Sequence, residues 1–491
     1  MTLSRTIAPI LAAFALASLA ACTVGPDFVA PQAAAPDDWT SWHSGDPALQ
    51  GPAGTGTPIP AQWWTLLGDP VLDRLVQQAM AASPDLQTAA LHFAQARVQQ
   101  GVVAGAGQPQ VNAQAQVSRN RQSENGASTR LFDAIGSDRD TLAKFLAQPF
   151  TLYRGGFDAA WEPDLWGRIQ RMNEQAGAMT ARQQALLDLA RLSVAAEVAQ
   201  AYFDLRVTQR QISLSEEDTR LLHERTGLVA ARVKGGLEDH SGLERENAAL
   251  NALRASLPAL KARETMQLNR IAVLAGRHPG ELDADLRGAA QAGAELPDLS
   301  LGMPSEVALR RPDVRAALAR LHAATAGIGV ATAELYPAIR LGGGFDLESY
   351  RSENLFDWGS RSWSIGPSLS LPLFDGGRRR RMIELRKLEE REAAVAFQQT
   401  MLRAWQEIDD ALSGYTSERL QHERLAARAG NAANALALAE ARYRAGALSY
   451  LPVIDARRAQ MQALRDLADC EGRLRLRFVA INKAIGNGPG E

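Results

Sequence analysis

Residues 363–378 read WSIGPSLSLPLFDGGR and contain the change of hydrophobic period that decides the fold. Up to Leu373, apolar side chains alternate with Ser and Gly, a period-two pattern typical of a strand with one apolar and one polar face. Pro367 inside the run is unfavourable for a central strand. The span from Arg378 to Arg444 contains no proline. It predicts one helix about 100 Å long, so the stretch predicts a strand that leads directly into an unusually long helix.

Landmarks that recur in order indicate a tandem duplication. The pairs are Pro84 with Pro312, Pro109 with Pro337, Arg168 with Arg378, and Arg232 with Arg442. The first two pairs share one spacing and the last two share a shorter one, so the first copy holds extra residues between Pro109 and Arg168. We therefore expect one longer loop in that interval.

Each copy contains two runs in which apolar and polar residues alternate. The runs are Val111 to Val117 and Phe157 to Glu162, then Ile339 to Leu347 and Trp363 to Leu373. Such strands suit a membrane barrel whose outer face meets lipid and whose inner face meets water. Two β-hairpins in a soluble domain would alternate in the same way, and the pattern alone leaves both interpretations open.

Long helical hairpins account for most of the remaining sequence. Arg168 to Lys234 lacks proline like its counterpart in the second copy, and each span is followed by a turn and a shorter helix, near 243–275 and 453–485. Narrow, alanine-rich apolar stripes at spacings of three and four would let these helices pack closely.

The composition excludes several classes of function. Lys and Arg number 53 against 55 Asp and Glu, so the chain lacks the basic excess of a nucleic-acid-binding protein. Its two cysteines form no disulfide framework or zinc cluster, and we expect Cys470 to be a small core residue. HExxH, phosphate-loop and GxSxG motifs are absent. We therefore expect no enzyme, metal site or cofactor.

The segment 1–21 is expected to be an export signal. The apolar run Ile7 to Ala21 is shorter than the roughly 20 residues that a membrane-spanning helix needs. Leu19-Ala20-Ala21-Cys22 resembles a bacterial lipoprotein signal, in which the cysteine is lipidated and becomes the first mature residue. The alternative is an ordinary cleavage site followed by an unrelated Cys22.

Four strands cannot close a membrane barrel by themselves. The smallest membrane barrels use eight strands, and an open sheet edge in hydrocarbon costs several kcal/mol per unsatisfied backbone group. If the strands cross a membrane, the chains must therefore share one barrel. Two chains would give eight strands filled by side chains, whereas three would give twelve and leave a passage.

Further motifs follow one another in a specific order. They are Cys22–Phe28 with Pro31, Trp63-Trp64, Gly68-Asp69-Pro70, Pro84-Asp85-Leu86, Leu373–Arg378, Arg442–Gly446 and Ser449–Arg458. With them, essentially the whole mature chain resembles the TolC-like outer membrane factor family of Gram-negative bacteria, in particular its NodT and OprM-like efflux lipoproteins.

The resemblance implies a mixed α/β membrane protein. The expected assembly is a homotrimer with a twelve-stranded outer-membrane β-barrel, four strands per chain, continued by a long α-helical periplasmic barrel of coiled-coil hairpins. The protein would be anchored in the outer membrane by lipid on Cys22 and extend into the periplasm. The residue after Cys22 is Thr23, as in lipoprotein signals that are sorted to the outer membrane. The implied partners are a periplasmic adaptor, an inner-membrane transporter of the RND type and outer-membrane lipid.

The expected organisation combines the duplication with this resemblance. In chain order it is a signal peptide (1–21), an extended N-terminal segment and belt region (22–82), repeat one (83–280) with a helix, a β-hairpin (110–166) and a long helical hairpin (168–278), a linker in the belt region (281–304), repeat two (305–486) with a helix, a β-hairpin (338–374) and a long helical hairpin (378–485), and a C-terminal tail (487–491).

The resemblance places a periplasmic gate at the tip of the second helical hairpin. Leu451 would form an apolar constriction, Asp455 an anionic ring that favours cations, and Arg458 would pair with a neighbouring carboxylate. Arg442 and Tyr443 match residues that latch the inner hairpin to its neighbour. The alternative is that Asp455 and Arg458 are solvated charges at a helix start.

The first copy departs from the family pattern at its tip. Glu244 stands where relatives often have Asp, so the acceptor for Arg442 remains open between Glu244 and Asp239. The candidate adaptor contacts at the two tips are Gly236, Ser241, Gly446 and Ser449. Gly236 and Gly446 would end their helices in a conformation that disfavours a Cβ.

The expected function is passive export of small molecules in a tripartite efflux system. No Met-rich tract for copper or silver is present, which favours drugs or other organic compounds. The alternatives are a conduit for type I protein secretion or metal efflux, and a lipid-anchored periplasmic coiled-coil scaffold.

Overall fold

A computed structural model of the chain describes residues 23–31, 44–49, 59–126, 139–287, 296, 299, 301 and 304–489. It divides into two compact units. The first comprises Met1–Val29, Arg97–Met179 and Leu321–Glu392; the second comprises Ala30–Ala96, Thr180–Arg320 and Ala393–Glu491. Cys22 and the predicted signal lie outside the described residues, so lipidation stays a prediction.

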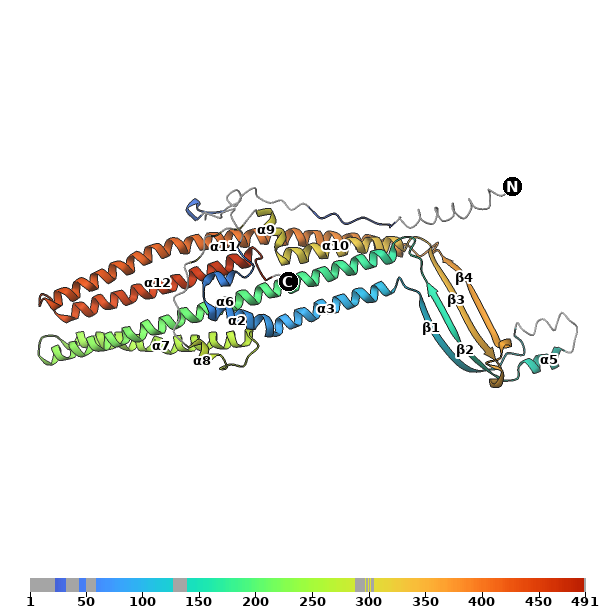
Figure 1. Ribbon diagram of the computed structural model, residues 1–491, viewed down its shortest axis with the longest axis horizontal. Helices are drawn as coiled ribbons and strands as arrows, with labels where there is room; N and C mark the ends of the chain where they lie inside the picture. Colours follow the sequence, from blue (N-terminus) through green and yellow to red (C-terminus); the bar gives the residue numbers. More distant parts are fainter. Residues whose placement is uncertain are drawn as a thin grey trace. The chain divides into compact units, whose positions relative to one another are not determined.

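Helices dominate the structure, and four strands form its sheet (Figure 1). The helices are α2 (Pro70–Ala82), α3 (Pro84–Gly105), α5 (Arg139–Leu146), α6 (Arg168–Lys234), α7 (His240–Leu274), α8 (Asp283–Leu286), α9 (Pro304–Arg310), α10 (Pro312–Ala333), α11 (Arg378–Arg444) and α12 (Tyr450–Ala484). The strands are β1 (Gln110–Asn120), β2 (Phe150–Trp161), β3 (Ala338–Ser349) and β4 (Arg361–Ser370). Among the described residues, no helix is both long and apolar enough to span a bilayer.

The two predicted long helices are confirmed, because α6 and α11 each run unbroken for 67 residues. The returning helices α7 and α12 have 35 residues each. They begin slightly earlier than predicted, at His240 and Tyr450, and α7 accommodates an exposed proline, Pro258, inside its length. The chain therefore forms the two long helical hairpins that its sequence predicts.

The core of the second unit lies where the long helices meet the segment around α2. The predicted α6 stripe is buried from Val194 to Leu205, while Ile212 at its end is only half-buried. Trp63 is completely buried and packs edge-on against Phe478 of α12, with ring centroids 6.1 Å apart. Cys470 is completely buried, as predicted, and burial together with the Glu418 charge raises the pKa of its thiol to about 11.

Asp69 connects the start of α2 to this core. One carboxylate oxygen caps the helix by accepting hydrogen bonds from the amides of Val71 and Leu72 at 3.0 and 3.3 Å. The other accepts a 2.5 Å hydrogen bond from the hydroxyl of Tyr202 on α6. Burial and this bond raise the pKa of Tyr202 to about 12, so the phenol stays protonated as a donor. This part of the chain lies within the predicted extended segment and belt region (22–82), and the helix α2 was not predicted.

Arg311 is a buried cation at the start of α10. Its guanidinium donates to Glu407 of α11 at 2.5 Å, to the carbonyl of Ala484 at the end of α12 at 2.6 Å, and to Asp313 at 2.8 Å. The side chain is 6% exposed. One arginine thus connects three helices of the second unit.

The sheet belongs to the first unit and has the order β1-β2-β3-β4, with every neighbouring pair antiparallel. Partners across the register share a face, so one face is apolar and the other polar. The apolar face carries Val111, Val117, Tyr153, Phe157, Trp161, Ile339, Leu341, Phe345, Leu347, Trp363, Ile365 and Leu369. The polar face carries Asn112, Gln114, Gln116, Arg154, Asp158, Arg340, Asp346, Glu348, Ser364 and Ser368. The predicted two-faced strands are confirmed.

Two details of the sheet depart from or refine the prediction. β4 ends at Ser370, so Leu371 and Leu373 are not part of the strand, because Pro372 between them has no amide to donate. Pro367 does lie in β4, opposite Leu341 of β3, which is the one strand that β4 pairs with in the described chain. The connection after β1 (121–149) is longer than that after β3 (350–360), which confirms the predicted longer loop in the first copy. This loop contains α5, which was not predicted.

The segment after Cys22 is bound to the first unit by Arg171 of α6. Arg171 donates to Asp27 at 2.6 Å and to the carbonyl of Val24 at 3.3 Å, while its other partner is Glu174 at 2.7 Å. Phe28 stacks on the ring of His322 at 4.3 Å. These contacts give the residues next to the predicted lipid site a defined position on the unit.

Arg311 and its neighbour Arg310 provide a matched test of this fold. We expect Arg311→Ala to destabilise the protein by about 3 kcal/mol, because it leaves the buried carbonyl of Ala484 and the carboxylates of Asp313 and Glu407 without their donor. Arg310→Ala removes an ion pair to Glu306 in which both side chains are more than half exposed, and we expect a change below about 1 kcal/mol. Thermal unfolding in detergent measures both. Equal losses in the two variants would contradict the role given to Arg311.

Candidate functional site

The tips of the two helical hairpins have the same geometry. Gly236 and Gly446 both have φ of +72°, a left-handed conformation that disfavours a Cβ. The amide of the residue after each glycine bonds back to the last turn, Leu237 to the carbonyl of Arg232 and Ala447 to that of Arg442, both at 2.9 Å. The glycine helix ends are confirmed, and their spacing in the sequence is that of the neighbouring landmarks Arg232 and Arg442.

The two returning helices start differently. Asp239 caps α7 by accepting hydrogen bonds from the Ser241 hydroxyl at 2.6 Å and the Gly242 amide at 2.9 Å. These bonds lower the pKa of Asp239, which is therefore ionised. Ser449 occupies the equivalent position before α12 and makes no side-chain cap.

Arg442 is exposed at the second tip and contacts neither proposed acceptor. Within the described part of this single chain it forms no ion pair with Glu244 or Asp239, and Asp239 is occupied in capping α7. Its counterpart in the first copy, Arg232, pairs with Glu238 at 3.0 Å. Tyr443 packs against Tyr450 with ring centroids 5.1 Å apart. The acceptor of Arg442 therefore stays a prediction.

Asp455 is held by Arg225 of α6. The guanidinium of Arg225 pairs with Asp455 on α12 and, at 3.1 Å, with Glu246 on α7. One arginine thus joins three helices near the tips. Asp455 keeps 52% of its side chain exposed, whereas Arg225 is 23% exposed.

Asp218, further from the tip along α6, is a buried carboxylate between two arginines of α12. Arg458 donates to one oxygen at 2.8 Å and Arg465 to the other at 2.9 Å, and the Asp218 side chain is only 3% exposed. The predicted carboxylate partner of Arg458 is therefore on α6 of the same chain. Leu451, at the start of α12, is half-buried.

These contacts form what we call the α6–α12 ladder: Asp218 and Arg225 on α6 with Asp455, Arg458 and Arg465 on α12. When two opposite charges are buried together, removing one leaves the other buried without a counter-charge, and this loss destabilises the fold. The ladder therefore fixes α12 on α6 within each chain. The α6 members of the ladder, Asp218 and Arg225, were not predicted. The signal that could have found them is their spacing of one heptad, which Arg458 and Arg465 on α12 share. Residues one heptad apart lie on the same face of a helix.

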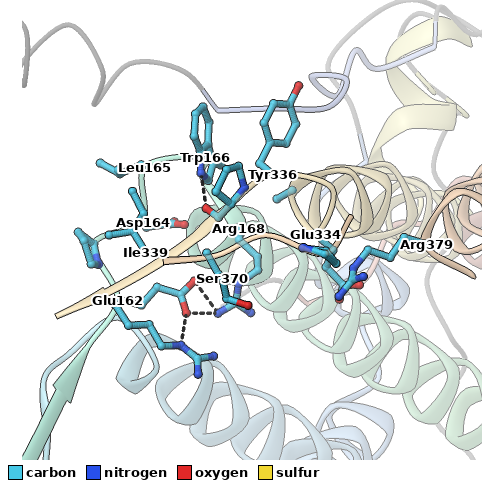
Figure 2. Close-up of a pocket in the computed structure, with 16 residues that line it drawn as sticks. Glu162, Asp164, Leu165, Trp166, Arg168, Glu334, Tyr336, Ile339, Ser370 and Arg379 are labelled. Carbon is cyan, nitrogen blue, oxygen red and sulfur yellow. Dashed lines mark hydrogen bonds and ion pairs between the residues drawn. The ribbon is translucent and has the colours of Figure 1, made fainter. Parts of the chain in front are cut away.

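A second concave site lies where strands meet helices in the first unit. A cavity of about 230 Å³ lies there. Figure 2 shows its lining residues, among them Trp166, whose indole donates to the carbonyl of Pro337. The rings of Trp166 and Tyr336 stack with centroids 4.9 Å apart. Arg168 donates twice to Glu162, each time at 3.1 Å. This ion pair joins the residue after β2 to the first residue of α6.

Comparison with known proteins identifies the family that this chain matches. The model of the outer membrane efflux protein family matches residues 75–277 and 303–487. The outer membrane protein OprJ of Pseudomonas aeruginosa is 30% identical over 96% of this chain and 94% of its own length. The antibiotic efflux pump outer membrane protein ArpC of Pseudomonas putida is 26% identical over 96% and 93%.

A solved structure agrees with both the fold and the family. That of the outer-membrane channel OprN has 30% sequence identity and a TM-score of 0.80, covering 95% of this chain and 99% of that one. A match of this extent takes in the sheet as well as both helical hairpins. The predicted resemblance is confirmed: the chain belongs to the outer membrane efflux protein family and is an outer-membrane efflux channel.

Proposed function

We propose that three copies of this chain form one passive conduit through the outer membrane and that the α6–α12 ladder keeps its periplasmic end closed. The observation that carries this proposal is the sheet, which has one apolar face, one polar face and two edges without a partner strand among the described residues. An open edge cannot remain in hydrocarbon. Pairing β4 of one copy with β1 of the next removes both edges.

The number of copies follows from the size of the passage. Two sheets would give eight strands, whose interior is filled by side chains, whereas three give twelve and leave an aqueous channel. The polar face would then line the channel and the apolar face would meet lipid. A homotrimer with a twelve-stranded barrel continued by the helices is the smallest assembly that conducts.

Unpartnered apolar stripes on two helices support contacts between copies. On α11, Leu385, Leu388, Val395 and Leu402 are 46% to 65% exposed at spacings of three and seven. On α3, Leu91, Val98 and Val102 are 62% to 69% exposed at spacings of seven and four. These are the spacings of a coiled-coil seam. In a ring that pairs β4 with β1 of the next copy, α11 of one chain can pack on α3 of the other.

The gate is proposed at the start of α12. Leu451, Asp455 and Arg458 would form its constriction and charge rings, and Arg442 and Tyr443 would latch one chain to the next through Glu244 or Asp239. Opening moves α12 away from α6 and must break the ladder. Because Asp218 is buried, separating it from its arginines costs free energy. An external partner that contacts the tips must supply that free energy.

The proposed partners and cargo are those of an efflux system. An adaptor would contact the glycine turns and the neighbouring Ser241 and Ser449, and an inner-membrane transporter of the RND type would supply energy. ArpC, which this chain resembles over nearly its full length, is named for an antibiotic efflux pump. Together with the absence of a Met-rich tract, this favours drugs or other organic compounds. Type I secretion and metal efflux remain the alternatives for the same conduit.

Disrupting the α11 stripe tests the homotrimer. We expect Leu388→Glu to lower the trimer fraction by more than about tenfold, because it buries carboxylates without partners in the seam. Lys387→Gln, one residue away and off the stripe, should leave assembly unchanged. Mass determination in detergent distinguishes the two. A Leu388→Glu protein that assembles like the parent would contradict the seam.

Removing Asp218 tests the gate. Loss of a buried partner costs about 3 kcal/mol, which corresponds to a shift of the closed-to-open equilibrium by about two orders of magnitude. We therefore expect Asp218→Asn, and to a smaller extent Asp455→Ala, to raise the leak current in planar bilayers. Lys261→Gln is the control, because its pair with Glu216 is exposed and joins α6 only to α7. Leak as low as the parent in assembled Asp218→Asn channels would refute the ladder as a closing element.

Cys22→Ser tests the lipid anchor. We expect this variant to lose labelling by radioactive palmitate and to keep its assembly, because the barrel itself holds the trimer in the membrane. Labelling that persists in the variant would show that the lipid is attached elsewhere.

A further inference from the structure

The polar face of the sheet changes in character along its length. At the end where the strands join the helices, the register places Ala160, Gly342 and Gly366 in one row. Two and three rows further, it places Asp346 beside Gly156 and Glu348 beside Arg154. Arg340 lies one row before the row of small residues and pairs with Glu162 at 3.6 Å. Small side chains thus separate Arg340 from a second group of charged residues further along the face.

Asp346 is the centre of the charged part. Arg154 of β2 donates to one of its oxygens at 2.7 Å, and Gln114 of β1 donates to the other at 3.4 Å. Three strands therefore contribute to this contact, although the residues are up to 232 positions apart in sequence. The Asp346 side chain is 12% exposed, whereas Arg154 is 44% exposed, so the guanidinium rises above the carboxylate on the face.

The backbone beneath Asp346 leaves room for its carboxylate. A Cβ on Gly156 would lie 2.4 Å from Oδ1 of Asp346 and 2.3 Å from the carbonyl oxygen of Phe345. Real contacts of a Cβ are never that short, so only glycine fits at this position. By contrast, a Cβ on Gly344, two residues before Asp346, would make an ordinary contact at 3.6 Å. The glycine at position 156 of β2 therefore makes the space that the Asp346 carboxylate occupies.

The charges here do not cancel. Asp158, Asp346 and Glu348 lie on three consecutive rows of the polar face, and the one guanidinium on those rows is that of Arg154. Arg340, two rows before Asp158, already pairs with Glu162. Asp158 accepts a hydrogen bond from the amide of Asn112 at 3.1 Å, which leaves its charge uncompensated. Glu348 is exposed. A pair that only braced the sheet would need no such excess of negative charge.

We propose that Arg154, Asp346 and Glu348, with Asp158, form a selectivity ring inside the barrel, separate from the helical tips. The inference rests on the proposed function, in which the polar face lines the passage of a trimer. Three copies then place a net excess of six carboxylates around the lumen. Carboxylate rings favour cations. The ring therefore favours solutes that carry an ammonium group over anionic ones of similar size.

Ion selectivity of the reconstituted trimer tests the ring. The reversal potential is measured in planar bilayers under a KCl gradient for Asp346→Asn, Arg154→Gln and the double variant. Asp346→Asn should shift the potential towards zero, because cation preference falls. Arg154→Gln should shift it away from zero, because the excess of negative charge grows. The double variant, with no net change of charge, should return close to the parent.

Two further variants keep the test decisive. Glu348→Gln removes an exposed carboxylate of the same ring and should shift the potential in the same direction as Asp346→Asn even if that variant fails to assemble. Glu306→Gln on α9, in the other unit, is the control and should leave the potential unchanged. Conducting trimers whose reversal potential is the same in every ring variant would overturn the selectivity ring and leave the proposed channel intact. A parent that forms no conducting trimer would overturn the proposed function itself.

Discussion

The constraint on which the rest of this structure depends is the unpaired backbone at the two edges of a four-stranded sheet. β1 and β4 each have a partner on one side only within the described part of the chain, and a membrane offers no water to satisfy the other side. If the apolar face lies in lipid, as we propose, strands of other copies must pair with both edges. Each chain has the same two edges, so in this account assembly is part of folding rather than a later event.

The long helices are subject to a different physical constraint, which concerns their exposed surface. α6 and α11 are unbroken helices of 67 residues each, and both α3 and α11 leave a row of apolar side chains exposed in the single chain. Towards the tips, α6 and α12 are instead joined by charges, with a buried carboxylate between two arginines. Apolar interfaces suit permanent contacts, whereas ion pairs between two helices form or break when the helices move relative to each other. We infer that the permanent contacts lie between copies and the releasable ones lie within a chain.

Much of the fold follows from the sequence because two periods of hydrophobicity dominate it. The alternation in Val111 to Val117 and the proline-free spans give β1, α6 and α11 almost residue by residue, and the change of spacing between the repeated landmarks gives the longer β1–β2 loop. The helix α2 was missed because its signal is local, a cap by Asp69 before Pro70. α5 was missed because it lies in the loop without a counterpart in the second copy.

The candidate site was only half predictable for a similar reason. Residues after the second tip, such as Asp455 and Arg458, stand out because they follow a distinctive turn. Their partners Asp218 and Arg225 lie inside a long helix among many charges, and only the packing of α12 on α6 selects them. The same holds for Asp346, whose contact with Arg154 depends on the register between β2 and β3.

Residue-resolved amide hydrogen exchange of the assembled protein in detergent tests the central claim most directly. If neighbouring copies pair β4 with β1, the amides of these strands that point away from β2 and β3 will be as protected as those in the centre of the sheet. Exchange of those outward amides at the rate of a solvent-exposed chain, while β2 and β3 stay protected, would contradict the shared barrel.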